Sequence, residues 1–313
     1  MKKSTIITIF ISISFLFIIS LTICFGLLTP NKKSFYIEDT LSDGKGQDAK
    51  IIILAGQSNA AGCSRDEYLK MNVSESKYQE YENGYDNIYI NYFISNSNIS
   101  SKFVKCRNNQ GEAGGFFGPE LGLAEELNKQ YPDQLFFIIK YTWSGTNLYD
   151  QWLSSSSFGN TGKLYEQFIE FTKTSIKYLV SKNYNVSIEG MCWMQGESDA
   201  SSYLPSYNYE MHLLNFITDI RKEFSQYASR DGIAFIDAYI AESTGYWPYS
   251  EMVNKAKKNV AKMSYYNYVI DTEKEGLTCT NEPFENPDRA HYDSLSEIKL
   301  GYLFAINLIK YFN

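Results

Sequence analysis

The alternation of short apolar runs with segments of helical periodicity constrains the fold of this chain most. The predicted strands are residues 50–55, 134–142, 186–194, 232–239 and 265–271. The predicted helices are residues 119–130, 164–181, 203–227, 251–263 and 294–311. Continuous apolar runs are typical of strands buried on both faces, and strands that alternate with helices form parallel sheets. The sequence therefore predicts an α/β fold, a three-layer α/β/α sandwich around a roughly five-stranded parallel sheet.

One stretch does not share this alternation. Residues 63–116 are polar, rich in Asn and Tyr, and only weakly periodic. We interpret them as a long insertion between the first strand and the next helix of a single domain that covers residues 50–313. Long loops in compact domains are often functional, so we expect this insertion to shape a pocket.

The N-terminus has the pattern of a membrane-targeting segment. Two lysines, Lys2 and Lys3, precede an uncharged apolar run of more than 20 residues, and residues 31–49 resemble a short polar stalk. A signal peptide usually has an apolar region of ~7–15 residues, whereas a bilayer is spanned by ~20. We favour a signal anchor over residues 1–30, with a cleaved signal peptide as the alternative. Either one sends the domain into the secretory pathway, to the extracellular or lumenal side.

Charge and histidine content argue against several classes of function. The net charge is −7 and the sequence has no basic stripe, which disfavours nucleic acid as a partner. Only two histidines, His212 and His291, are present, with no HExxH motif and no Cys–His pairing at zinc spacing. We therefore predict no metal site.

The cysteines leave two interpretations open. Cys24 lies in the apolar N-terminal run, which leaves Cys63, Cys106, Cys192 and Cys279 in the domain. Four cysteines in an exported domain can form two disulfides. The alternative is that Cys192, within an apolar strand, is a buried thiol.

A serine and a glycine come directly after the first two long strands. Ligands of parallel α/β sheets bind beyond the carboxyl ends of the strands, so residues at these positions are the first candidates for a site. Ser58 comes after the first strand, where its backbone N–H can stabilise an oxyanion; by itself, such a Ser is more often a helix cap. Gly145 comes after the second strand and can present its N–H to a ligand, or it is an ordinary strand-ending glycine.

An amide and two carboxylates come after the third strand. Gln195 offers a side-chain N–H where an oxyanion can form. Glu197 and Asp199 are paired carboxylates, which also occur in glycosidases. For Asp199, a role in capping a helix N-terminus is the more ordinary interpretation.

The best candidate for a base lies near the C-terminus. Asp288 precedes His291 by three residues, so its carboxylate can accept a hydrogen bond from the imidazole Nδ1–H and leave Nε2 to take a proton. His212 lies within a predicted helix and not at a strand end, so we interpret it as a structural or surface histidine.

The order of these groups resembles the SGNH hydrolases, and in particular the branch of sialate O-acetylesterases and acetylxylan esterases with a GQSN block. The resemblance covers roughly residues 50–313 except 63–116, and five blocks carry it. The first four are Ile51 to Gly62 with Gly56-Gln57-Ser58-Asn59, Phe117-Gly118-Pro119-Glu120, Ser144-Gly145-Thr146, and Trp193-Met194-Gln195-Gly196-Glu197-Ser198-Asp199. The last is Asp288-Arg289-Ala290-His291. Two positions depart from the branch: Ser144 replaces a usual second Gly, and Met194 stands where His is frequent.

The resemblance implies an SGNH/flavodoxin-like fold and a serine esterase that removes acetyl groups from carbohydrate through an acetyl-enzyme, with no metal or organic cofactor. It implies Ser58 as the nucleophile, His291 as the base and Asp288 as its partner. The backbone N–H groups of Ser58 and Gly145, with the Gln195 side chain, would form the oxyanion hole. We also expect four neighbouring residues to line the substrate pocket: Gln57, Asn59, Thr146 and Glu197.

Three alternatives differ in class from this interpretation. The chain could be a surface protein that binds carbohydrate with little catalysis, although the intact Ser58, Asp288 and His291 count against it. It could be a lipid or short-chain acyl esterase of the same superfamily, which a membrane anchor would suit. A glycosidase that uses Glu197 and Asp199 is the weakest, because it leaves the GQSN and D-x-x-H blocks unexplained.

Overall fold

A computed structural model describes residues 34–229, 232–242 and 245–312. Its strands are β1 (Asp48–Gly56), β2 (Ser64–Arg65), β3 (Ile88–Ile94), β4 (Asn98–Ile99), β5 (Val104–Lys105), β6 (Phe116–Phe117), β7 (Leu135–Thr142), β8 (Asn185–Met194), β9 (Ala234–Ala238) and β10 (Asn267–Ile270). Six of them form a parallel sheet in the order β10–β9–β8–β1–β7–β3. The short strands β4 and β5 pair antiparallel with β3, and β2 pairs with β6 outside the sheet.

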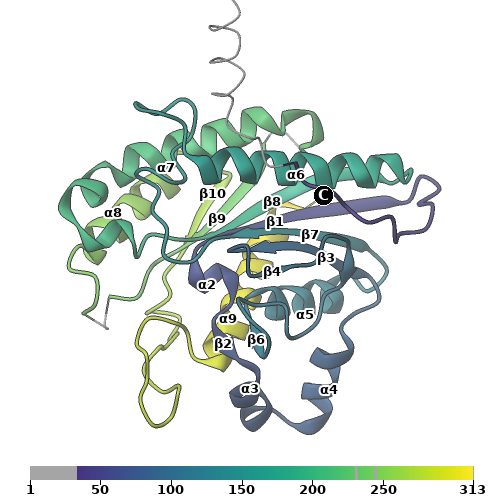
Figure 1. Cartoon of the computed structure of the whole chain (residues 1–313), viewed down its shortest axis with the longest axis horizontal. Coiled ribbons are helices and arrows are strands. Elements are labelled where there is room, and N and C mark those ends of the chain that lie inside the picture. Colours follow the sequence, from purple (N-terminus) through teal and green to yellow (C-terminus); the bar gives the residue numbers. More distant parts are fainter. Residues whose placement is uncertain (1–33, 230–231, 243–244, 313) are drawn as a thin grey trace, which may run out of the picture. The chain divides into compact units, whose positions relative to one another are not determined.

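Helices cover both faces of this sheet. They are α2 (Ser58–Ala61), α3 (Asp66–Asn72), α4 (Glu75–Asn83), α5 (Glu120–Gln130), α6 (Lys163–Ser181), α7 (Tyr203–Glu223), α8 (Ser250–Ala261) and α9 (Ser294–Leu308), with short 3-10 turns at Asp199–Ser201, Ser225–Tyr227 and Ile309–Tyr311. Figure 1 shows α6, α7 and α8 on one face and α5 and α9 on the other. The predicted three-layer α/β/α sandwich is therefore confirmed, and all five predicted strands are present.

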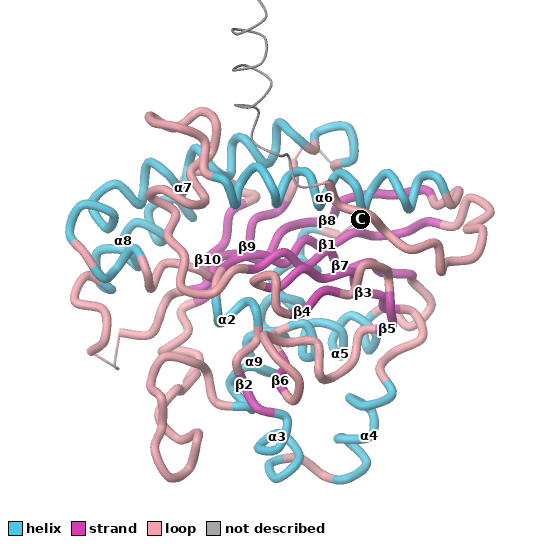
Figure 2. The backbone as a smooth tube through the Cα atoms, viewed as in Figure 1, coloured by secondary structure: helices cyan, strands magenta, loops and turns pink. Residues whose placement is uncertain are grey.

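The stretch that we interpreted as an insertion adds a sixth parallel strand. β3 pairs with β7 from Ile88 to Ile94 and carries β4 and β5 on its other side, as Figure 2 shows. Asn91 lies in the middle of β3 and is fully buried, where its side chain donates to Ser175 Oγ at 3.0 Å. This buried polar residue and the neighbouring tyrosines interrupt the apolar run that would have predicted the strand.

The register of the three central strands aligns their carboxyl ends. Gly56, the last residue of β1, pairs with Thr142 of β7 on one side and with Met194 of β8 on the other. All eight residues of β7 are buried, as expected for a strand covered on both faces. The chain leaves β1 in one direction toward β3 and β7 and later returns to β8 on the other side. The loops after β1, β7 and β8 therefore meet at a topological switch point, where α/β sheets bind their ligands.

The described cysteines are all thiols. Cys63, Cys106, Cys192 and Cys279 form no disulfide, and Cys192 is buried in β8 as the thiol interpretation expected. The predicted signal anchor lies outside the described residues. Within the described part of the chain, none of the helices has the length and apolar character needed to cross a bilayer.

Candidate active site

Ser58 lies at the switch point, immediately after the central strand. It is the first residue of α2, and 8% of its surface is exposed. The preceding residue, Gln57, donates its backbone N–H to Met194 O at 2.9 Å, which ties the turn to the end of β8. The first N–H groups of a helix have no partner within the helix. The Ser58 N–H is therefore free to donate to a ligand at this edge.

Asp288 and His291 form a hydrogen-bonded pair, as the sequence predicted. Asp288 Oδ2 lies 2.8 Å from His291 Nδ1, and Oδ1 accepts the backbone N–H groups of Ala290 and His291 at 2.8 and 2.9 Å. Burial disfavours the charged imidazole, but interactions with Asp288 and with Cys63 outweigh burial and raise the pKa of His291 above its usual value. The pKa of Asp288 is lowered although burial opposes this, because it accepts these bonds.

Asn59 joins the segment that contains Ser58 to the segment that contains His291. Its side-chain Nδ2 donates to Ala290 O at 3.2 Å, and its Oδ1 accepts the backbone N–H of Tyr292 at 3.2 Å. These are the residues on either side of His291, so Ser58 and His291 are brought together by the residue next to Ser58. The structure records no hydrogen bond between Ser58 Oγ and the His291 ring; such bonds are often long before substrate binds.

Glu197 binds the side chain of Asn59. Its Oε1 accepts Asn59 Nδ2 at 2.8 Å, and only 1% of the residue is exposed. Burial raises the pKa of this carboxyl. Glu197 thus contacts the side chain that positions the His291 segment, and it faces away from solvent.

A cavity opens beside His291. Its volume is about 180 Å³, and its lining includes Cys63, Arg65, Tyr68, Phe116, Asp288 and His291. Cys63 lies beside His291 and helps to raise the pKa of the His291 ring, while burial raises the pKa of the Cys63 thiol itself. The cavity combines aromatic side chains, one cation, two carboxylates and the candidate base, which suits a ligand with both polar and apolar surface.

The loop after β7 brings Gly145 to the same edge. Trp143 N donates to Gly56 O at 3.0 Å, which fixes the start of the loop against the end of β1. Gly145 has a φ of +68°, and a Cβ built on it would meet no atom within 4 Å. Its backbone therefore borders open space at the switch point.

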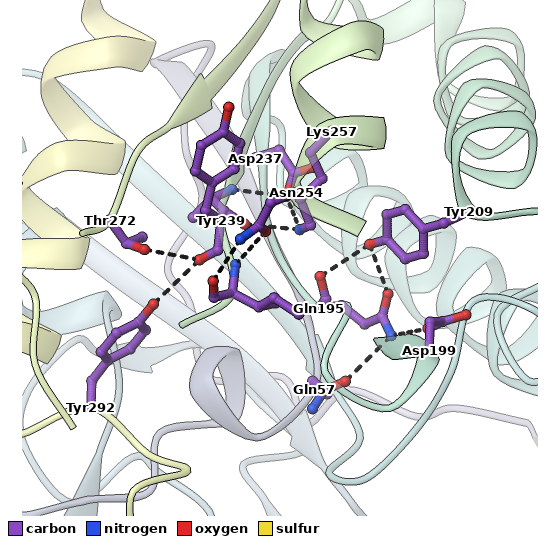
Figure 3. Close-up of polar contacts among 12 residues, drawn as sticks. Gln57, Gln195, Asp199, Tyr209, Asp237, Tyr239, Asn254, Lys257, Thr272 and Tyr292 are labelled. Atoms are coloured by element: carbon purple, nitrogen blue, oxygen red, sulfur yellow. Dashed lines mark hydrogen bonds and ion pairs between the residues drawn. The ribbon is translucent and has the colours of Figure 1, made fainter. Parts of the chain in front are cut away.

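Gln195 is the centre of a buried network, shown in Figure 3. Its Nε2 lies 2.6 Å from Asp199 Oδ2, 2.9 Å from Thr146 O and 3.3 Å from Gln57 Oε1. The hydroxyl of Tyr209 donates to the Gln195 carbonyl and lies 3.0 Å from its Oε1. Both N–H bonds of this amide are thus directed to protein acceptors, and its predicted contact with an oxyanion stays a prediction.

Asp199 fixes the loop that carries Gly145 and caps no helix with its side chain. Its carboxylate accepts the backbone N–H groups of Leu148 and Tyr149 at 2.8 and 3.0 Å. Burial raises the pKa of Asp199 to about 6, and these bonds oppose that rise. Asp199 and Glu197 therefore bind different protein segments and do not face one another across an open cleft.

The four residues expected to line the pocket are buried. Gln57, Asn59, Thr146 and Glu197 have exposed fractions of 1–4% and make hydrogen bonds to protein groups. Their direct contact with substrate stays a prediction. In the structure they connect the loops that carry the candidate catalytic groups.

The remaining predicted features lie elsewhere. His212 is buried on α7, and its ring packs 5.5 Å from that of Tyr149. Glu120, from the block after β6, forms a fully buried ion pair with Lys140 at 2.7 Å. Across the described ranges, three or more His, Cys, Asp or Glu side chains nowhere gather in a geometry that could hold a metal.

Three residues that contact the candidate catalytic groups or their loops were not predicted from the sequence, and neither were Arg65, Tyr68 and Phe116 of the cavity. Cys63 contacts His291, Glu112 contacts the loop that carries Gly145, and Tyr209 contacts Gln195. Tyr209 is one of many tyrosines, and Glu112 lies in the weakly periodic stretch, so neither has a local signal. Cys63 comes shortly after the GQSN block, and that proximity was the only hint.

Comparisons with known proteins identify a family and a shared fold. The family model for carbohydrate esterases described as sialic acid-specific acetylesterases matches residues 48–310. No curated protein matches the sequence. The fold is similar to that of a protein from Arabidopsis thaliana, with a TM-score of 0.62 and 18% identity over 84% of this chain and 99% of that one.

Two further solved structures share the fold. NanS has a TM-score of 0.62 and 16% identity, over 87% of this chain and 98% of that one. The carbohydrate acetylesterase XAC1771 from Xanthomonas citri has a TM-score of 0.53 and 14% identity, over 84% of this chain and 56% of that one. With the family model matched over nearly the whole described chain, this protein belongs to the sialic acid-specific acetylesterase family of carbohydrate esterases.

Proposed function

We propose that this protein removes O-acetyl groups from carbohydrate, with Ser58 as nucleophile and His291 as its base. The observation that carries the proposal is the Asp288–His291 pair, which Asn59 joins to the segment of Ser58 at the switch point of the sheet. A nucleophile, a base and a group that orients the base are the components of a serine esterase.

The reaction has two steps. Ser58 Oγ attacks the acetyl carbonyl while His291 Nε2 takes the hydroxyl proton, and Asp288 stabilises the imidazolium that forms. The tetrahedral intermediate collapses when His291 gives that proton to the departing sugar oxygen. Water, activated by His291 in the same way, then attacks the acetyl-enzyme and releases acetate and free Ser58.

The oxyanion is stabilised by backbone donors in this proposal. The N–H groups of Ser58 and Gly145 both border the switch point. The Gln195 amide is the third predicted donor, and to act it must direct one N–H away from Thr146 or Asp199. Loss of a single oxyanion donor typically lowers turnover by ~100–1,000-fold.

The sugar is proposed to occupy the cavity beside His291. The leaving oxygen must lie next to the group that protonates it, and this cavity contains His291 on one wall and Tyr68 and Phe116 on others. Arg65 lines the cavity together with the carboxylates of Glu282 and Asp288, and its guanidinium pairs with Glu67 at 3.3 Å. The family description names sialic acid, so acetylated sialic acid is the first substrate to test, ahead of acetylated xylan or another glycan.

The test is hydrolysis of p-nitrophenyl acetate and p-nitrophenyl butyrate by the full chain and by Ser58→Ala. We expect acetate turnover that falls steeply with the longer acyl chain and is abolished in Ser58→Ala, with an unchanged circular dichroism spectrum. Ser198→Ala, a nearby serine outside the proposed machinery, is the control and should retain activity.

Other outcomes would favour the alternatives. Unchanged turnover in Ser58→Ala would contradict the proposal. Equal rates for acetate and butyrate would favour a short-chain acyl esterase. Glycan binding by a well-folded protein that hydrolyses no acetyl ester or acetylated glycan would favour a carbohydrate-binding protein.

We also propose, from the sequence of residues 1–30, that the domain acts on the far side of a membrane, anchored there or secreted. The length and lack of charge of the apolar run support an anchor. Carbonate extraction of membranes tests this, since an anchored protein stays in the membrane pellet and a cleaved one is released.

A further inference from the structure

The loop that carries Gly145 is held from two sides by carboxylates. On the far side, Asp199 accepts the N–H groups of Leu148 and Tyr149. On the near side, Ser144 donates its hydroxyl to Glu112 Oε2 at 2.7 Å. Gly145 comes directly after Ser144, and it has a positive φ and open space where a Cβ would be. The contacts of Ser144 on one side and of Leu148 and Tyr149 on the other therefore hold the loop around it.

Ser144 is fixed by its main chain as well as by its side chain. Its backbone N–H donates to Ser95 Oγ at 3.0 Å, and that hydroxyl lies 3.4 Å from the same Glu112 oxygen. A glycine at position 144, which the related branch usually has, would lack the hydroxyl bond. The hydroxyl bond to Glu112 therefore depends on the serine at this position.

Glu112 is itself attached to the segment of Ser58. Its backbone N–H donates to Gly62 O at 2.9 Å, and the Gly62 N–H donates to Ser58 O at 2.9 Å. The backbone carbonyl of Glu112 accepts a hydrogen bond from the Ser97 hydroxyl at 3.1 Å. One residue thus connects the end of α2, which begins at Ser58, with the loop after β7.

We propose that Glu112 is a positioning residue of the esterase: through Ser144 it sets the distance between the Gly145 and Ser58 N–H groups, so that both reach the same oxyanion. This inference rests on the proposed function. Oxyanion donors must lie 2.7–3.1 Å from the atom that they stabilise, and a misplacement of ~1 Å can cost ~100-fold in rate. Glu112 does not touch substrate in this role.

The place of the Glu112–Ser144 contact in the reaction predicts which kinetic constants change. An interaction that matters only when the oxyanion forms changes kcat and leaves ground-state binding intact. Glu112→Ala and Ser144→Ala in the full chain should each lower kcat for p-nitrophenyl acetate by about 10–100-fold, with KM changed by less than about twofold. The thermal midpoint should stay close to that of the unmodified chain.

Rescue and coupling distinguish positioning from a general loss of structure. Glu112→Gln keeps an oxygen that accepts the Ser144 hydroxyl, so it should retain most of the activity. The double variant of Glu112→Ala with Ser144→Ala should be no slower than either single one, because both remove the same contact. Inhibition by methylboronic acid, whose serine adduct places a hydroxyl in the oxyanion hole, should weaken in parallel with kcat/KM.

The control is Glu75→Ala, an exposed glutamate on α4, which should leave every constant unchanged. Full activity in Glu112→Ala and Ser144→Ala, failure of Glu112→Gln to rescue, or additive losses in the double variant would each overturn the inference. Ser58→Ala is measured in parallel. If Ser58→Ala stays active, the proposed function itself fails. If Ser58→Ala is inactive and Glu112→Ala is fully active, only the positioning role of Glu112 fails.

Discussion

Asp288 orients His291 through two different contacts. Its Oδ2 accepts from the ring, while Oδ1 accepts two backbone N–H groups, one of them from His291 itself. One carboxylate therefore fixes both the direction of the ring and the turn that presents it. The ring nitrogen that is left, Nε2, is the one available to take the Ser58 proton.

The raised pKa of His291 predicts the pH dependence of the reaction. A base acts in its neutral form, and Asp288 stabilises the protonated ring, so the inactive form persists to higher pH. We expect kcat/KM to rise with pH and to level off above the pKa of His291. In Asp288→Asn that pKa falls, which moves the rising limb to lower pH, while the plateau falls by ~10³–10⁴-fold.

A pH–rate profile of both proteins checks this prediction. Asp271→Asn is the control and should reproduce the original profile. Asp271 is an exposed carboxylate at the start of the connection between β10 and α9, which also contains Asp288. A rising limb in Asp288→Asn at the same pH as in the unmodified chain would show that another group sets it.

At the scale of elements, the site exists because three strands end level with one another. The turn after β1, the loop after β7 and the segment after β8 all leave the sheet at paired residues. The His291 segment reaches this edge from the other end of the chain and is held there by Asn59, while Ser64 Oγ donates to Tyr292 O at 2.6 Å. Four separate connections thus meet around Ser58.

The packing of α5 against α9 depends on close backbone contact. A Cβ at Gly122 of α5 would lie 1.9 Å from Ile298 O, and one at Gly301 of α9 would lie 2.0 Å from Pro119 O. The backbone on each side cannot yield as a flexible side chain would. Any side chain at these positions must push α9 away from α5.

Gly122→Ala is therefore expected to lower the free energy of unfolding by about 2 kcal/mol or more. Gly114→Ala is the control, because a Cβ there meets nothing within 4 Å, and its effect should stay within about 0.5 kcal/mol. Urea denaturation followed by tryptophan fluorescence measures both. Equal stabilities of the two variants would mean that the helices move apart at little cost.

At the scale of the whole molecule, every group in the proposed site belongs to one compact unit, Tyr36–Asn313. The central sheet, both helical layers and the His291 segment all lie within it.

We predict that a chain starting at Tyr36 folds and hydrolyses p-nitrophenyl acetate with the kcat/KM of the full chain in detergent. Circular dichroism melting and initial rates check this. A matched chain that starts at Ile51, and so lacks the first residues of β1, should fail to fold because β1 is the central strand. Loss of activity in the Tyr36 chain would assign the N-terminal segment a part in the reaction.

The sequence by itself determined the layers, the five strands and the pairing of Asp288 with His291. These depend on local information: apolar runs are visible as strands, and two residues one turn apart meet wherever that turn lies. The strand β3 was missed because its buried Asn91 interrupts the apolar run, and a long-range contact with Ser175 satisfies that side chain.

Only the tertiary structure decided how the polar groups of the motifs are used. Gln195, Glu197 and Asp199 come after one strand, yet they bind two other connections of the sheet. Gln195 binds Thr146, and Asp199 binds Leu148 and Tyr149 of the same loop after β7, whereas Glu197 binds Asn59 after β1. The contacts of Glu112 and Cys63 likewise join residues far apart in sequence. The physical reason is that a buried polar group must find a hydrogen-bond partner, and which partner is in reach depends on how the loops converge at the end of the sheet.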